Sequence, residues 1–149
     1  MRSSCRLVGS LAMVLGLGGA CSGPPALCNG CPDVSGVYAL TRTLSGQDQC
    51  AGAPLPGAVR ALVTQNGSRL TYELEGVVLK GFLYEDLSSS ASGQGSVDGT
   101  ATSVELTGSF VEDAAAAGGL VLRADVIQTI TQGNPGRSCQ VRAFLEGAR

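Results

Sequence analysis

Apolar and polar residues alternate over short runs from Val34 onward, and Gly, Ser, Asn and Pro separate the runs. Alternation with a period of two is typical of β-strands that bury one face. No amphipathic helix pattern lasts for three turns in this part of the chain. The pattern therefore predicts an all-β domain that covers residues 34–149.

Seven segments are predicted to be strands, because β-prone residues cluster between turn residues or because apolar residues recur at every second position. In the third segment Leu70, Tyr72 and Leu74 share one face. The Asn66-Gly67 pair that precedes it predicts a tight hairpin, since both residues accept a positive φ. The predicted strands are 37–44, 58–65, 69–76, 77–86, 102–110, 120–132 and 138–147.

Two segments between these strands lack the pattern. Residues 88–100 are rich in Ser and Gly, and we expect them to form a mobile loop or a weak edge hairpin. Residues 112–119 end in two glycines. We expect a connector there, with one helical turn at most before the glycines stop it.

Strands that each carry one apolar face need a partner that covers this face. Seven or eight strands joined by short loops achieve this by closing on themselves, which also removes the exposed sheet edges. We therefore expect an antiparallel up-and-down meander that closes into a small barrel. A two-sheet β-sandwich is the alternative.

The first twenty residues have the features of an export signal. Arg2 and Arg6 precede an apolar stretch over 7–17, and small residues follow at 18–20. The apolar stretch is too short for a membrane-spanning helix, which needs about 20 residues. We interpret residues 1–20 as a signal peptide that is cleaved on export.

This order of residues, followed at once by Cys21, resembles the signal of bacterial lipoproteins. The resemblance implies that Cys21 is acylated, becomes the mature N-terminus and ties the protein to a membrane. Ser22 implies the outer membrane as the destination, and residues 21–33 are then the lipid-attachment cysteine and a linker. Gly18 stands where that motif has a branched apolar residue. The alternative is cleavage after Ala20, which gives a secreted or periplasmic protein.

The remaining cysteines are expected to form two disulfides. If the signal is removed and Cys21 carries lipid, four cysteines are left in an oxidising compartment. In a closed meander the last strand pairs with the first, which brings Cys139 close to Cys50, just beyond the first strand. Cys28 is then left to pair with Cys31.

Few residues in the chain suggest catalysis. Cys28 and Cys31 have the spacing of a redox site, but such a site needs a helix that starts after a strand. A zinc site needs four ligands, and the chain has neither histidine nor a second Cys-x-x-Cys pair. The lack of histidine also excludes a Ser-His-Asp triad. We expect a protein that is not an enzyme and has no metal or cofactor.

The charged residues indicate a solvated surface. After residue 20 the chain has eight Arg and Lys against twelve Asp and Glu, a net charge near −4. The basic residues are scattered singly, so nucleic acid is not an expected partner. Acidic pairs are interpreted as surface groups; they are Glu73 with Glu75, Glu85 with Asp86, and Glu112 with Asp113.

The segment "DVSGVYALTRT" at 33–43, followed by "VTQNGSRLTYELEG", resembles the start of small bacterial lipocalin-like lipoproteins. These begin with a Gly-x-Trp turn into the first strand of a barrel. Gly36 and Tyr38 occupy the glycine and aromatic positions, although the chain has no Trp. The resemblance implies that Arg142 packs across the ring of Tyr38 and closes one barrel end. It also implies a barrel that takes a small apolar ligand.

The functional expectation is an exported, lipid-anchored envelope protein that is not catalytic and binds a small hydrophobic ligand in its barrel. The alternative is a structural or protein-interaction module of the envelope, with a filled barrel and no ligand. The sequence names no protein partner and no ligand-binding residue.

Overall fold

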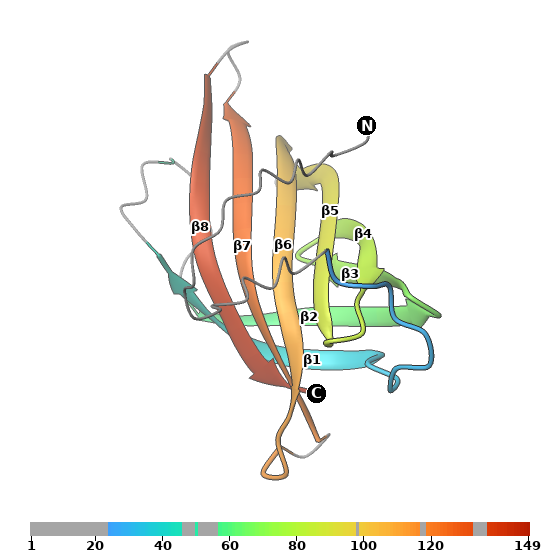
Figure 1. The fold of residues 1–149 in the computed structure, drawn as a ribbon. Helices are drawn as coiled ribbons and strands as arrows, with labels where there is room; N and C mark the ends of the chain where they lie inside the picture. Colours follow the sequence, from blue (N-terminus) through green and yellow to red (C-terminus); the bar gives the residue numbers. More distant parts are fainter. Residues whose placement is uncertain (1–23, 46–49, 51–56, 98, 117–118, 133–136) are drawn as a thin grey trace, which may run out of the picture.

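The computed structural model describes residues 24–45, 50, 57–97, 99–116, 119–132 and 137–149. Within these residues, antiparallel strands close into one barrel: each strand pairs with the next, and the last pairs with the first (Figure 1). The predicted closed meander is confirmed, with eight strands. They are β1 (Gly36–Leu44), β2 (Gly57–Asn66), β3 (Arg69–Leu74), β4 (Val77–Leu83), β5 (Ser88–Val97), β6 (Thr100–Glu112), β7 (Leu120–Gln132) and β8 (Arg137–Ala148).

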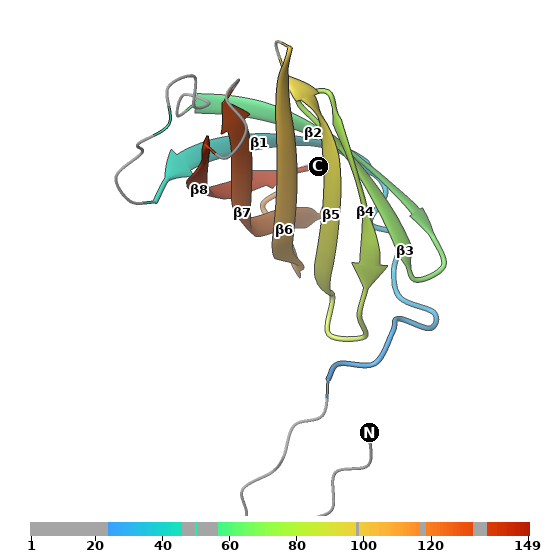
Figure 2. The same ribbon diagram turned by 90° about the horizontal axis from the view of Figure 1, so that it is seen from above.

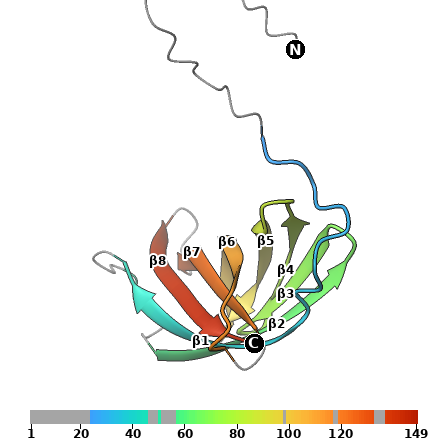
Figure 3. The ribbon, with the colours of Figure 1, turned by 60° about the horizontal axis from the view of Figure 1, so that its bottom comes forward.

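The barrel is strongly coiled rather than a straight cylinder. Strands β6 to β8 run side by side, while β1 and β2 cross them steeply at the bottom of Figure 1 and the top of Figure 2. Such tilting is required when a twisted sheet of eight strands closes on itself. Figure 3 gives the same arrangement from a third direction, with the strands following one another around a common interior.

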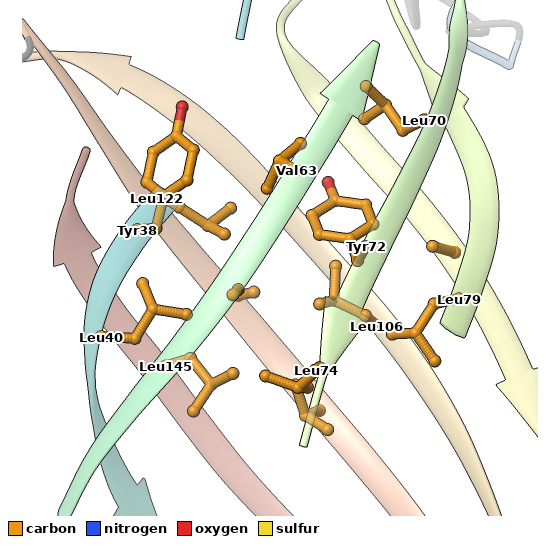
Figure 4. Packing of buried hydrophobic residues seen from close by; sticks show 14 of the residues in the cluster. Tyr38, Leu40, Val63, Leu70, Tyr72, Leu74, Leu79, Leu106, Leu122 and Leu145 are labelled. Atoms are coloured by element: carbon orange, nitrogen blue, oxygen red, sulfur yellow. The ribbon is translucent and has the colours of Figure 1, made fainter. Parts of the chain in front are cut away.

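The alternation predicted from the sequence decides which side chains fill the interior. Leu70, Tyr72 and Leu74, which were expected to share a face, are buried. The alternating apolar residues of two longer strands are buried as well: Val104, Leu106, Phe110, Leu120, Leu122, Ala124 and Val126. Tyr38 and Tyr72 are the largest side chains that are fully buried, and Figure 4 shows leucines from several strands packed around them. Burial of this apolar surface is the main stabilising contribution to the barrel.

The expectation of a loop or edge hairpin at 88–100 was wrong, because residues 88–97 form strand β5. This strand pairs with β6 along its whole length and with β4 at Lys80–Leu83. A Cβ atom on Gly93 would lie 2.2 Å from the carbonyl oxygen of Val78. Small residues therefore let neighbouring strands approach closely here. Strand β5 itself lacks an alternation of large apolar residues, because side chains of the neighbouring strands fill the barrel interior beside it.

The connections on either side of β3 are tight turns. Asn66 pairs with Arg69, which confirms the predicted hairpin; Gly67, at φ 62°, is in its loop. The β3–β4 turn consists of Glu75 and Gly76, with φ values of 48° and 82°. Two successive positive φ values suit the twist of a two-residue hairpin.

No helical turn is present in the described part of the connector at 112–119. The amide of Ala116 donates to the carbonyl of Asp113, and the amide of Gly119 donates to the carbonyl of Ala116. Gly119 has a φ of 70°. The connection is therefore a series of tight turns between β6 and β7.

The segment that precedes β1, residues 26–35, folds over one end of the barrel, and we call it the strap. Leu27 forms an antiparallel bridge with Tyr84, and Val34 is fully buried. The strap is drawn in blue beside β3 and β4 in Figures 1 and 2. The expected linker at 21–33 thus belongs to the fold from Ala26 onward. The predicted signal peptide and Cys21 lie outside the described residues.

Candidate functional site

Both predicted disulfides are present, one toward each end of the barrel. Cys28–Cys31 lies within the strap. Cys50–Cys139 joins the β1–β2 connection to β8 across 89 residues of sequence. Closure of the meander explains the second bond, since β8 pairs with β1 and places their neighbouring segments together.

The strap end of the barrel is filled. The amide of Val34 donates to Gln65 Oε1 at 2.8 Å, and the hydroxyl of Tyr38 donates to the carbonyl of Val34 at 2.9 Å. Burial, the largest cause, raises the pKa of Tyr38 to about 12, and the nearby Arg149 guanidinium opposes the rise. The hydroxyls of Tyr38 and Tyr72 point to the same side in Figure 4. These polar groups of the strap end are thus paired with one another.

Arg149, not Arg142, closes the strap end. Its Nη1 atom donates to the carbonyl oxygens of Asp33 and Ser35, each at 3.1 Å. Arg142 is exposed, since its neighbours Val141 and Ala143 are buried and successive residues of a strand face opposite sides. The predicted contact of Arg142 with Tyr38 is therefore wrong.

The opposite end, which we call the Arg42 end, contains a buried charge. Arg42 follows Tyr38 and Leu40 on the inward side of β1 and is 6% exposed. It lines a recess whose walls are mostly apolar. Among the side chains that form these walls are Leu74, Val77, Val104, Val126, Val141 and Leu145.

The guanidinium of Arg42 forms a salt bridge and a hydrogen bond with the carboxylate of Glu75. Glu75 is 40% exposed and stands at the rim of the recess, in the β3–β4 turn. Its φ of 48° lies in a region that costs a non-glycine residue roughly 1–3 kcal/mol. The two-residue hairpin requires this φ. The buried charge and its partner at the rim lead us to take Arg42 and Glu75 as the candidate site.

The recess is small when Arg42 and Glu75 are paired. The volume that the centre of a water molecule can occupy is only about 20 Å³. This is room for one or two water molecules. Among the described residues that line the recess, Gln128 is the one polar side chain besides Arg42 and Glu75. A larger ligand enters only if the rim moves outward.

The sequence predicts neither Arg42 nor Glu75 as part of a site. It places Glu75 on the solvated surface together with Glu73, and Glu73 is exposed. The sequence does contain a signal for the burial of Arg42. It lies two residues after Leu40 and four after Tyr38, and this spacing puts its side chain on the inward side of the first strand. No local pattern connects Arg42 with Glu75, because the two lie 33 residues apart.

The described residues contain no group of three or more His, Cys, Asp or Glu side chains that could hold a metal ion. They also contain no helix with the length and apolar character needed to cross a membrane. Comparisons of the chain with protein-family models, with curated proteins and with solved structures gave no match. The candidate site is therefore interpreted from its own residues.

Proposed function

We propose that this chain is an exported, lipid-anchored envelope protein without catalytic activity, which binds a small hydrophobic ligand at the Arg42 end of its barrel. The observation that carries the proposal is a buried cation in an apolar recess at one end of an otherwise filled barrel. Ligand sites in proteins combine apolar walls with a few placed polar groups in this way. The ligand would enter from the rim, next to Glu75.

Export is supported by the two disulfides. Bonds such as Cys28–Cys31 and Cys50–Cys139 persist in oxidising compartments outside the cytosol. The short distance in sequence from Cys21 to the strap supports a particular orientation. Ala26 lies five positions after Cys21, and five extended residues span at most about 18 Å. A lipid on Cys21 would hold the strap end at the membrane and leave the Arg42 end accessible.

The anchor is tested by fractionating cells that express the full chain. Cys21→Ser should move the protein from the membrane fraction to the soluble fraction, because lipid can no longer be attached. Cys5→Ser, in the predicted signal peptide, is the matched control and should leave the protein in the membrane fraction. Membrane association of the Cys21→Ser protein at the unchanged level would refute the anchor.

A filled barrel that works as a protein-interaction module is the second candidate. It is favoured by the fully buried Tyr38, Tyr72 and Leu122 and by the small volume of the recess. Native mass spectrometry of the protein after mild purification separates the two functions. A co-purified small amphiphile supports ligand binding, whereas an empty barrel in a stable complex with another protein supports the interaction module.

A further inference from the structure

Arg42 is an unusual choice for a residue that only fills a barrel. A guanidinium is charged at every relevant pH, and taking it out of water costs several kcal/mol unless it is well paired. Apolar side chains of similar volume are often as stable or more stable at such positions. Its inward neighbours on β1 and β8, Leu40 and Leu145, are apolar and fully or almost fully buried. The charge of Arg42 therefore calls for an explanation other than packing.

Glu75 supplies a carboxylate to Arg42 from the rim of the recess. It belongs to a two-residue turn rather than to a strand, and it is partly exposed while Arg42 is buried. The carboxylate thus stands between the guanidinium and solvent. An anionic group that arrives from solvent would meet Arg42 at the place that Glu75 now occupies.

The walls below Arg42 suit an apolar chain. Val97, Val104, Val126, Val141 and Ala143 line the recess with short side chains. With Glu75 in place the recess has room only for water. Outward movement of Glu75 would remove its carboxylate from the guanidinium and would also widen the recess. A bound amphiphile requires both changes, and one residue would bring both about.

We propose that Arg42 binds the anionic head group of a short-chain amphiphile, such as a fatty monocarboxylate, and that Glu75 competes with this head group for the guanidinium. The planar fork of arginine matches a carboxylate with two parallel hydrogen bonds. The tail then lies against the valines of the recess. This inference rests on the proposed ligand-binding function and assigns the chemical class of the ligand.

The test is a titration of the disulfide-bonded protein, followed by calorimetry and by the NMR signal of the Arg42 Nε–H group. The probes are octanoate, 1-octanol and octyltrimethylammonium, which share a tail and differ in the charge of the head group. Octanoate should bind at least tenfold more tightly than the other two and should shift the Arg42 Nε–H signal. Glu75→Gln should raise the affinity for octanoate about tenfold, since the internal competitor loses its charge.

Matched variants separate the site from general effects of charge. Arg42→Met should abolish the preference for octanoate over 1-octanol, and Arg42→Lys, which keeps the charge without the fork, should reduce it. Glu146→Gln breaks the exposed Arg123–Glu146 salt bridge on the outer face and should leave every affinity unchanged. Arg42→Lys keeps the test decisive if Arg42→Met does not fold.

The outcomes distinguish this inference from the proposed function. Equal binding of octanoate and 1-octanol, or an affinity for octanoate that Glu75→Gln leaves unchanged, would overturn the head-group assignment and leave an apolar ligand site intact. Absence of binding by all three probes in both the original protein and Glu75→Gln would overturn the ligand site itself.

Discussion

The side chain of Arg149 lies against the backbone of Gly36: a Cβ atom on Gly36 would come within 2.4 Å of Arg149 Cδ. The contact joins the beginning of β1 to the residue that follows β8. From there the guanidinium reaches the strap, where it donates to two backbone carbonyls. One side chain thus connects both ends of the closed meander with the segment that covers the strap end.

Removing this side chain should loosen the strap. In Arg149→Ala the carbonyls of Asp33 and Ser35 lose their charged donor, and such hydrogen bonds contribute about 1.5–3 kcal/mol. We expect faster amide hydrogen exchange at 33–35, measured by mass spectrometry, with little change in β6 and β7. Arg142→Ala is the control, since Arg142 is exposed on the outer face. Similar exchange in the two variants would contradict the role of Arg149.

The two disulfides should contribute unequally to stability. In the chain-entropy model, a bond that closes a loop of about 90 residues stabilises by up to roughly 4.6 kcal/mol, and one that closes four residues by roughly 1.9 kcal/mol. Replacing Cys50 and Cys139 by Ala should therefore lower the free energy of unfolding more than replacing Cys28 and Cys31. Denaturation by urea measures both. A larger loss in the second variant would mean that strap packing outweighs loop closure.

The buried tyrosines should make the barrel less stable in alkali. Burial raises the pKa of Tyr38 to about 12 from 10.0, and burial also raises the pKa of Tyr72, against the opposing hydrogen bond with Ser89. Between the unfolded and folded pKa values the unfolded state loses protons that the folded state keeps, so stability falls as the pH rises. The contribution of Tyr38 is complete below about pH 10 and is lost toward about pH 12.

Urea denaturation at a series of pH values checks this prediction. Tyr38→Phe and Tyr72→Phe should each flatten the alkaline decline, because phenylalanine has no proton to lose. Far-UV circular dichroism at neutral pH serves as the control that the variants fold. A decline as steep in both variants as in the original protein would assign the alkaline loss to other groups.

The glycines of β5 should differ in their tolerance of a side chain. A Cβ at position 93 would lie 2.2 Å from the Val78 carbonyl oxygen, whereas one at position 95 would lie 3.2 Å from the nearest atom, a methyl group of Val77. Gly93→Ala should lower the free energy of unfolding by about 2 kcal/mol or more, within the usual range for overpacking. Gly95→Ala is the control and should cost less. Thermal unfolding gives the comparison, and equal effects would argue against the close approach of β4 and β5 at Gly93.

The sequence by itself determined most of the strands, because alternation is a local property that any strand with one buried face must have. It also determined the hairpin at Asn66-Gly67, since a tight turn depends on neighbouring residues alone. Closure followed from the need to cover every apolar face, and the Cys50–Cys139 pairing followed from closure. Closure of the barrel and the Cys50–Cys139 pairing are long-range features. The sequence predicts them nevertheless, because every strand has an apolar face that must be covered.

The tertiary structure decided what depends on the particular neighbours of a residue. Strand β5 has no apolar pattern, and it forms because β4 and β6 satisfy its backbone hydrogen bonds and fill the interior beside its glycines. Whether Arg149 or Arg142 closes the strap end depended on which face of β8 and which end of the barrel each one reaches. The pairing of Arg42 with Glu75 arises only when the β3–β4 turn meets β1 at the rim, since attraction between charges requires a closeness in space that no local pattern encodes.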